Sequence, residues 1–323
     1  MARAIRFHET GSADVLRLEN VAVGDPGPGE ARVRHTAVAV NFIDIYFRTG
    51  QYPTPLPSGL GSDAVGVVEA VGAGVTDIAV GDRVGYLIGP QGAYSDVRTM
   101  PAAVLIRIPD GVSDSTAATL MMKGMTAQYL FRQVYPLHGG ETILYHAAAG
   151  GVGLIACQWA RALGVTMIGV VSSDEKAAAA RAHGCTHTIV STRENIVERV
   201  KALTDGKGVP VVFDSVGKDT LNDSLDCLQP RGTLVSNGTA SGPVVVDTRQ
   251  LAAKGSLWLT RPAMMHYIMP RAHMLEMADE VFGMVLAGQI RSEPAQSFAL
   301  AQAAQAHRML ESRKSVGATI LIP

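Results

Sequence analysis

Two different rhythms of apolar and polar residues divide the chain near residue 115. Before that point, short β-branched runs such as residues 30–40 and 64–72 are separated by glycine and proline, and Gly81-Asp82 forms a turn that feeds a further strand. Short strands punctuated in this way predict a small all-β or partly β barrel. Residues 115–134 are helical in composition, and strand-like and helix-like segments then alternate.

The alternation over residues 142–260 predicts a doubly wound parallel sheet. The first helix-like segment places Val152, Ile155 and Trp159 at helical spacing, and Gly164 follows as a C-terminal cap. The predicted strands cover residues 142–147, 165–171, 186–190, 209–214, 231–236 and 256–260, and the predicted helices cover 151–163, 174–183, 194–204, 219–228 and 248–254. Six strands with five intervening helices are typical of a Rossmann-type domain.

The alternation ends after residue 260. Residues 271–287 and 301–313 are expected to be helices, and residues 317–323 are expected to form a strand. This last strand could rejoin the first domain, which would make that domain discontinuous. The sequence therefore predicts an α/β protein with a β-rich domain of residues 1–123 and 261–323 and a Rossmann domain of residues 124–260.

The run from His146 to Gly153 lies between a predicted strand and a predicted helix. In that context, a glycine-rich turn brings backbone N–H groups and the positive end of a helix to a pyrophosphate. Gly150 would allow the phosphates to approach, and Gly153 would let the helix pack closely on the strand. The candidate cofactor-binding residues here are Ala148, Gly150, Gly151, Val152 and Gly153. An ordinary strand-to-helix turn is the alternative, since alanine stands at 148 where the usual motif has its first glycine.

The residues after the second predicted strand indicate the phosphorylated coenzyme. An acid about 20 residues after the glycine turn normally holds the ribose 2′-hydroxyl of NAD, but this chain has Ser172 and Ser173 there. Small hydroxyls leave room for a 2′-phosphate, and Lys176 supplies a nearby positive charge. Asp174 is better placed as a helix N-cap or first-turn acid. We therefore expect NADPH rather than NADH.

Composition narrows the functional classes. The 28 basic and 29 acidic residues give a net charge of −1, which argues against nucleic acid or an anionic membrane as the main partner. The first residues lack a signal-peptide core, and no run reaches the ~18 apolar residues of a membrane span. The three cysteines are far apart and form no C-x-x-C pair. These features favour a cytoplasmic protein with reduced thiols.

Several further motifs accompany the glycine turn. They are residues 40–46, 50–53, 57–61, 81–84, 123–127, 146–153, 213–217 and 311–313. Together they resemble the medium-chain dehydrogenase/reductase superfamily, in its zinc-free quinone oxidoreductase (zeta-crystallin-like) branch. The resemblance implies a chaperonin-10-like catalytic domain, a Rossmann domain and an active site in the cleft between them. It also implies a homodimer joined by edge strands of the Rossmann sheets, to which residues 243–246 could contribute.

The resemblance also implies roles for individual residues. The residues expected to line the nicotinamide and quinone pocket are Asn41, Tyr46 and Tyr52. Those expected to meet the cofactor are Lys123 and Thr126 on its nicotinamide and pyrophosphate side, Asp214, Asn237 and Gly238 at strand ends, and Arg313 at the adenosine phosphate. Close relatives have a tyrosine beside the 2′-phosphate where this chain has Ser191, and Arg193 could compensate for it.

Zinc-dependent relatives place a cysteine near the position of Asn41 and carry Gly-His-Glu where this chain has Gly61-Ser62-Asp63. This chain has no cysteine before Cys157, so thiolate ligation of zinc in the first domain is impossible. The sequence therefore predicts a metal-free, NADPH-dependent quinone reductase. Two alternatives remain open. One is an NADPH-dependent reductase of activated carbon–carbon double bonds in enals or enones, and the other is a non-catalytic crystallin-like or RNA-binding protein.

Overall fold

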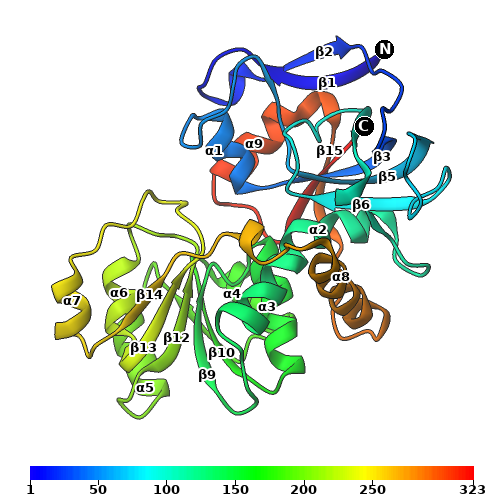
Figure 1. The fold of residues 1–323 in the computed structure, drawn as a ribbon. Helices are drawn as coiled ribbons and strands as arrows, with labels where there is room; N and C mark the ends of the chain where they lie inside the picture. The colour runs from blue at the N-terminus through cyan, green and yellow to red at the C-terminus, as the bar shows by residue number, and fades with distance from the viewer. The chain divides into compact units, whose positions relative to one another are not determined.

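The computed structural model describes residues 1–323, which form two compact units (Figure 1). The first unit contains Met1–Met125 and Pro270–Pro323, and the second contains Thr126–Met269. The sequence analysis assigned residues 124–125 to the second domain and residues 261–269 to the first. In the structure, residues 124–125 belong to the first unit and residues 261–269 to the second. Segment 261–269 belongs to the second unit because Met264 and Ile268 are buried and the Tyr267 ring stacks on Tyr129, with 4.9 Å between ring centroids.

The second unit contains the predicted parallel sheet. Its strands are β9 (Thr142–His146), β10 (Thr166–Val171), β11 (His187–Val190), β12 (Val209–Asp214), β13 (Leu228–Ser236) and β14 (Trp258–Thr260). They pair in the order β11-β10-β9-β12-β13-β14, and every pairing is parallel. The order reverses between β9 and β12, and ligands of such sheets bind at this switch point, beyond the carboxyl ends of the strands. The Rossmann prediction is confirmed.

Helices connect these strands as predicted. They are α3 (Gly151–Ala162), α4 (Asp174–Ala182), α5 (Ile196–Leu203), α6 (Leu221–Asp226) and α7 (Thr248–Ala253). The unit also contains a short π-helix, η3 (Leu130–Val134), and a short 3-10 helix, η4 (Met264–His266). α3 packs beside α4, and α5 packs beside α6. Gly164, Gly184 and Gly206 follow three of the helices with φ of 70°, 100° and 79°. That left-handed conformation is the one in which glycine ends a helix without steric cost. Residues 243–246, which the resemblance suggested as part of a dimer edge, lie outside any strand of the single chain.

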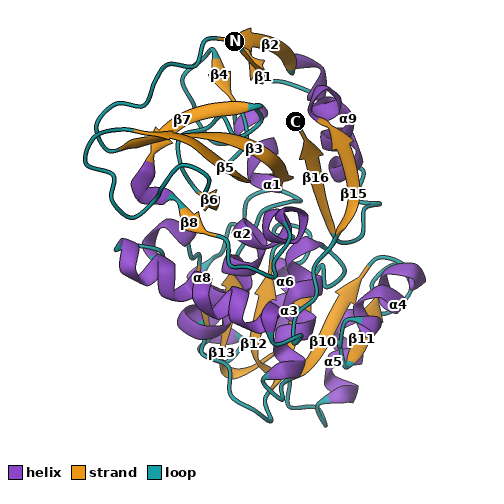
Figure 2. Cartoon of the chain, turned by 90° about the vertical axis from the view of Figure 1, so that its right-hand side faces the viewer, coloured by secondary structure: helices purple, strands orange, loops and turns teal.

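The first unit is rich in short strands. They are β1 (Ala2–Phe7), β2 (Arg17–Val21), β3 (Glu30–Val40), β4 (Ser58–Gly59), β5 (Asp63–Val71), β6 (Arg83–Leu87), β7 (Val97–Pro101), β8 (Ile106–Arg107), β15 (Pro294–Ala299) and β16 (Ala318–Ile322). One sheet has the order β15-β16-β3-β5-β6-β8, with β7 also paired to β3, and β2-β1-β4 form a second sheet. The predicted return of the C-terminal strand is confirmed, since β16 pairs antiparallel with β3 (Figure 2).

Helices also belong to the first unit. They are α1 (Phe42–Arg48), α2 (Asp114–Tyr129), which continues past Met125, α8 (Arg271–Leu286) and α9 (Ala303–Glu311), with the short turns η1 (Ala13–Val15), η2 (Ala102–Val104) and η5 (Leu300–Gln302). The helix α1 was missed in a segment read as strands. Its N-cap residue is Asn41, whose backbone N–H donates to Asp44 Oδ2 at 2.9 Å in a capping box. No helix in the structure is both long and apolar enough to span a bilayer.

Candidate functional site

The glycine turn of the second unit presents backbone donors at the start of α3. β9 ends at His146, Ala147 turns the chain with φ 55°, and Gly150 N–H donates to Ala147 O at 2.9 Å. Gly150 is the N-cap residue, and the first helical bond runs from Leu154 N–H to Gly150 O at 2.9 Å. The N–H groups of residues 151–153 precede that bond, and no side chain caps them. Such a helix start is suited to bind an anion.

Glycine is required at position 153 for packing. A Cβ atom there would lie 2.4 Å from Ala147 O and 2.5 Å from Ala148 O, both backbone atoms. Ala148 is buried, and its Cβ would lie 2.7 Å from a Cβ added at Gly169 of β10. The small residues of the turn therefore let α3 lie directly against the strand ends, as the sequence analysis proposed for Gly153.

The residues predicted to surround a 2′-phosphate meet at the ends of β10 and β11. Lys176 Nζ donates to Ser172 Oγ at 3.1 Å, and Ser191 N–H and Oγ both donate to Val171 O, at 2.9 and 3.1 Å. Ser173 is the N-cap of α4, since its Oγ accepts from Lys176 N–H at 3.3 Å. Ser172 and Ser191 are exposed, so this edge offers hydroxyl groups and one ammonium group to a ligand.

Arg193, which the sequence suggested as a substitute for the missing tyrosine at the 2′-phosphate, pairs with a carboxylate in this structure. Its guanidinium forms a two-pronged ion pair with Asp174, in which Nη2 and Oδ1 are 2.6 Å apart. Hydrogen bonding with Arg193 lowers the pKa of Asp174 below its usual range. Asp174 is a first-turn acid and not the N-cap. The pair holds Arg193 and neutralises the one carboxylate next to Ser173.

The ends of β12 and β13 differ in how their polar groups are satisfied. Asp214 accepts from the backbone N–H groups of Val216 and Gly217 at 2.8 and 3.1 Å, and from two hydroxyl groups at 2.7 Å. It therefore caps the turn after β12. In contrast, Ser236 Oγ and Asn237 Oδ1 are buried and have no hydrogen-bond partner. Buried polar atoms are normally paired, so these two atoms at a strand end are suited to meet a ligand.

Two neighbours of these residues have structural roles. A Cβ added at Gly238 would lie 2.5 Å from Ser215 O, so glycine lets the chain pass this backbone closely. His146 is buried, its Nε2 lies 3.0 Å from Ser224 Oγ, and burial lowers the pKa of its imidazole. His146 is thus a packed strand-end histidine, and its Nδ1 is buried without a hydrogen-bond partner.

In the first unit, Asn41 joins two charged side chains. Lys123 Nζ donates to Asn41 Oδ1 at 2.7 Å and to Val40 O at 3.4 Å, and Asn41 Nδ2 donates to Asp63 Oδ1 at 2.6 Å. Met122 N–H donates to the other oxygen of Asp63 at 3.2 Å. All three side chains are buried. The result is a fixed chain of donors from an ammonium group to a carboxylate.

Burial and charge act in opposite directions on this chain. Desolvation raises the pKa of Asp63 above its usual range, while the Lys123 charge opposes that rise. Desolvation lowers the pKa of Lys123, and the charges of Asp63 and Asp44 oppose that fall. Each charge therefore depends on the other to persist in the protein interior.

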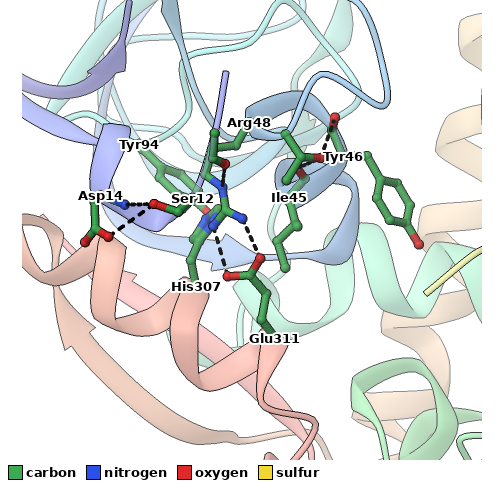
Figure 3. Close-up of polar contacts among 10 residues, drawn as sticks. Ser12, Asp14, Ile45, Tyr46, Arg48, Tyr94, His307 and Glu311 are labelled. Carbon is green, nitrogen blue, oxygen red and sulfur yellow. Dashed lines mark hydrogen bonds and ion pairs between the residues drawn. The ribbon is translucent and has the colours of Figure 1, made fainter. Parts of the chain in front are cut away.

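The two tyrosines predicted for the substrate pocket are also neighbours. Tyr46 and Tyr52 have ring centroids 5.3 Å apart, and Tyr52 N–H donates to Tyr46 O at 2.9 Å. Tyr46 is 8% exposed and Tyr52 is half-buried. Figure 3 shows the Tyr46 side chain pointing away from Arg48. The pair therefore packs against itself, which is also the ordinary role of a half-buried aromatic residue.

Sequence reasoning missed a polar cluster at α1, which we call the Arg48 cluster. It consists of the buried Asp44, Arg48, Tyr94 and His307 and the exposed Glu311. Arg48 is 1% exposed and forms a two-pronged ion pair with Glu311 (Figure 3), in which Nη1 and Oε2 are 3.0 Å apart. Arg48 Nε also donates to Gly11 O at 3.1 Å. The spacing Asn41-x-x-Asp44 was the one available signal, since it matches a capping box.

The remaining predicted residues lie elsewhere. Thr126 is half-buried in α2 and begins the second unit, whereas Arg313 is exposed just after α9 with φ 56°. Cys157, Cys185 and Cys227 are free and buried. No three His, Cys, Asp or Glu side chains are grouped so that they could hold a metal ion.

Comparison with known proteins agrees with both units. Residues 27–110 match the family described as "Alcohol dehydrogenase GroES-like domain", and residues 151–281 match "Zinc-binding dehydrogenase". A quinone oxidoreductase of Pseudomonas aeruginosa is 54% identical over 325 residues, covering 100% of both chains. A 2-haloacrylate reductase of a Burkholderia species is 46% identical, covering 100% of this chain and 99% of its own.

Among solved structures, the Escherichia coli quinone oxidoreductase complexed with NADPH superposes with a TM-score of 0.98 at 45% identity, and all of both chains is covered. Sequence identity of this extent over the full length, together with the GroES-like and Rossmann architecture, shows the family. The chain belongs to the medium-chain dehydrogenase/reductase superfamily, in its quinone oxidoreductase branch.

Proposed function

We propose that this protein is an NADPH-dependent quinone reductase. The observation that carries the proposal is the buried Lys123 ammonium group, held by Asn41 Oδ1 at 2.7 Å in a unit whose relatives are quinone oxidoreductases. An ammonium group has three N–H donors. Asn41 and Val40 accept two of them, so one is left for a ligand.

The second unit supports NADPH as the coenzyme. The uncapped start of α3 would hold the pyrophosphate, and Ser172, Lys176 and Ser191 would hold the 2′-phosphate. The unpartnered Ser236 Oγ and Asn237 Oδ1 would meet the nicotinamide end. By the family resemblance, Thr126, Asp214 and Gly238 would lie along the coenzyme, and Arg313 would meet the adenosine phosphate.

The chemistry would divide between coenzyme and protein. When bound, NADPH supplies a hydride. Negative charge then develops on a quinone oxygen, and the Lys123 ammonium group in a buried, pre-oriented position would stabilise that charge. Asn41 holds the ammonium group in place, and Asp63 in turn fixes the Asn41 amide. Tyr46 and Tyr52 would offer flat faces and hydroxyl groups to the quinone ring.

We propose that no metal takes part, although one matching family carries zinc in its name. Zinc sites in proteins use cysteine, histidine and carboxylate ligands. Here Asn41 instead donates directly to Asp63 and accepts from the Lys123 ammonium group, and no trio of metal-ligating side chains lies in either unit. Elemental analysis of active protein is expected to find less than stoichiometric zinc.

A second candidate function is reduction of an activated carbon–carbon double bond, which the 46% identity to a 2-haloacrylate reductase favours. Initial rates of NADPH oxidation with 1,4-naphthoquinone and 1,4-benzoquinone, against 2-chloroacrylate and a 2-alkenal, separate the two. We expect the quinones to have the higher kcat/KM. Faster turnover of 2-chloroacrylate would assign the second function, and no oxidation with any acceptor would contradict both.

We further propose a cytoplasmic homodimer that acts on quinones and does not bind RNA. The three buried, free cysteines are consistent with a reducing compartment.

The edge of the parallel sheet supports the homodimer. β14 is an edge strand of this sheet, and Trp258 on it is 67% exposed. An exposed edge with a large apolar side chain is a surface that a second copy would cover. Sedimentation equilibrium is expected to give twice the monomer mass.

A further inference from the structure

Asp44 is a carboxylate that receives hydrogen bonds from three directions in the interior of the first unit. Its Oδ2 accepts from the backbone N–H of Asn41 at 2.9 Å and from the Tyr94 hydroxyl at 3.0 Å. Its Oδ1 accepts from Ser62 Oγ at 3.0 Å. The side chain is fully buried, and no cation bonds to it directly. A buried carboxylate without a direct counter-ion is costly, so its retention calls for a specific role.

The direction of the donors around Asp44 follows from the other members of the Arg48 cluster, which are labelled in Figure 3. A guanidinium group can only donate, so Arg48 Nη1 donates to His307 Nδ1 at 3.2 Å. The proton of the neutral imidazole is then on Nε2, which donates to the Tyr94 oxygen at 3.0 Å. The Tyr94 hydroxyl hydrogen is left for Asp44. The chain Arg48–His307–Tyr94 thus delivers a fixed donor to the carboxylate.

Asp44 acts on both polar groups of the proposed quinone site. Its bond to Asn41 N–H fixes the start of α1, and Asn41 holds the Lys123 ammonium group. Its negative charge also raises the pKa of Lys123, against the effect of burial. Hydrogen bonds to an ionised group are about twice as strong as neutral ones. Protonation of Asp44 would therefore loosen Asn41 and disfavour the ammonium form of Lys123.

We propose that Asp44 is a positioning residue of the quinone site, whose charged form holds Asn41 and Lys123 in their working arrangement and whose protonation makes quinone reduction pH-dependent. The inference rests on the proposed function, because it assigns a role in that reaction. It adds a residue that touches neither substrate nor coenzyme and acts through Asn41 and Lys123.

The charge of Asp44 changes in an accessible pH range. Burial, and next the nearby charge of Asp63, raise the pKa of Asp44 to about 7, against the three hydrogen bonds. The other groups facing it are Tyr94, His307 and Arg48 on one side and Asp63 and Lys123 on the other. Burial lowers the pKa of His307 to about 3, and the pKa of Tyr94 is raised well above its usual value. Neither changes charge near neutral pH.

The test measures kcat/KM for 1,4-naphthoquinone from pH 5.5 to 9 with saturating NADPH. The wild-type protein is expected to lose activity on the acid side with one midpoint. Tyr94→Phe and Ser62→Ala each remove one donor that stabilises the carboxylate and leave the Asn41–Lys123 and Asn41–Asp63 bonds in place. Each is expected to move the midpoint up by about one pH unit. Asp44→Asn is expected to remove the acid limb and leave low activity throughout.

Tyr86→Phe is the matched control. Tyr86 is also a buried tyrosine of the first unit, but its hydroxyl lies 2.9 Å from His35 Nε2 and not at Asp44. The pH midpoint of kcat/KM in Tyr86→Phe is expected to equal that of the wild-type protein. A midpoint that does not move in Tyr94→Phe and Ser62→Ala overturns the inference, because a purely structural residue would change stability and total activity only.

Infrared spectroscopy checks the same group without turnover. The C=O band of a protonated carboxyl, absent in Asp44→Asn, is expected to titrate at the kinetic midpoint and to shift with it in Tyr94→Phe. Absence of that titration also overturns the inference. Absence of quinone reduction at every pH would instead contradict the proposed function, so the two failures are distinguishable.

Discussion

Lys123 is 6% exposed, and Asn41 Oδ1 and the nearby carboxylate of Asp63 favour its charged form against the effect of burial. Asp63 depends on the same arrangement, since burial raises its pKa and the lysine opposes that rise. Removing either partner leaves an uncompensated buried charge, which costs more than the pair contributes. At the residue scale, the packing of the first unit and the chemistry proposed for it therefore depend on the same three side chains.

Lys123→Met is expected to lower the free energy of unfolding by about 3 kcal/mol and kcat/KM for a quinone by roughly 100-fold. Denaturant titration and initial rates measure the two effects. The double variant Lys123→Met/Asp63→Asn should lose less stability than the two single variants added together. The exposed Lys201→Met is the control and should change neither quantity. Strict additivity in the double variant would show that the two charges do not interact.

Ser172 Oγ and Lys176 Nζ lie 3.1 Å apart at the end of β10, without a carboxylate between them. Ser172→Asp would place a negative charge beside Lys176, where it pairs with the ammonium group and repels a 2′-phosphate. The ratio of kcat/KM for NADPH over NADH should fall by about tenfold or more. Ser172→Asn has nearly the same shape without the charge and should keep the ratio. An unchanged ratio in the aspartate variant would remove Ser172 from the phosphate site.

At the scale of elements, the contact of α3 with β9 and β10 depends on small residues. Gly153 faces the carbonyl oxygens of Ala147 and Ala148, and Ala148 faces Gly169. The close approach brings the open N–H groups of α3 to the carboxyl ends of the strands, where an anion can reach them. In the first unit, the start of helix α1 has a similar effect, because its capping box places Asn41 beside Lys123.

Gly153→Ala puts a methyl group within 2.4 Å of a backbone oxygen that cannot move alone, so α3 must shift away from β9. We expect a loss of about 1–3 kcal/mol in unfolding free energy and weaker NADPH binding by calorimetry. Gly283→Ala in α8 is the matched control, because nothing lies within 4 Å of its added Cβ. It should stabilise the protein by about 0.5–1 kcal/mol. Equal effects of both substitutions would contradict the packing argument.

At the scale of the whole molecule, buried neutral histidines of the first unit make the stability of the protein depend on pH. His35 is 4% exposed, and its ring nitrogens lie 2.7 Å from Ser95 O and 2.9 Å from the Tyr86 hydroxyl. Burial lowers the pKa of His35 from 6.5 to about 4. The unfolded chain therefore takes up a proton before the folded one does, and stability decreases as pH falls from about 6.5 to 4.

Replacing His35 should flatten this pH dependence. The midpoint temperature of thermal unfolding of the wild-type protein is expected to decrease as the pH is lowered from 6.5 to 4. His35 should account for a loss of about 3 kcal/mol in unfolding free energy at pH 4. His35→Gln should be less stable at pH 7 but lose less on acidification. His8→Gln, at an exposed position, should retain the full dependence. A slope in His35→Gln equal to that of the wild type would contradict the assignment.

The periodicity of apolar residues determined the parallel sheet, its helices and the glycine turn, because each depends on local spacing and on conformations that single residues allow. The C-terminal strand and its return to the first domain were predicted from the sequence, but its pairing with β3 was known only from the structure. The short helix α1 was not, because seven residues, Phe42–Arg48, carry too little periodicity and only the capping box marks them.

Tertiary structure alone decided the polar interior of the first unit. Asp63 and Lys123 are 60 positions apart, and Arg48 and Glu311 are 263 apart, so no local pattern relates them. Arg193 and Lys176 were both candidate positive charges for the 2′-phosphate in the sequence. Only the folded structure shows that Arg193 pairs with Asp174 and that Lys176 lies beside Ser172. The sequence by itself determined the framework and its family, because local spacing encodes both. Which charges meet inside that framework was decided by long-range packing, because the free energy of a buried charge depends on neighbours that only the folded chain assembles.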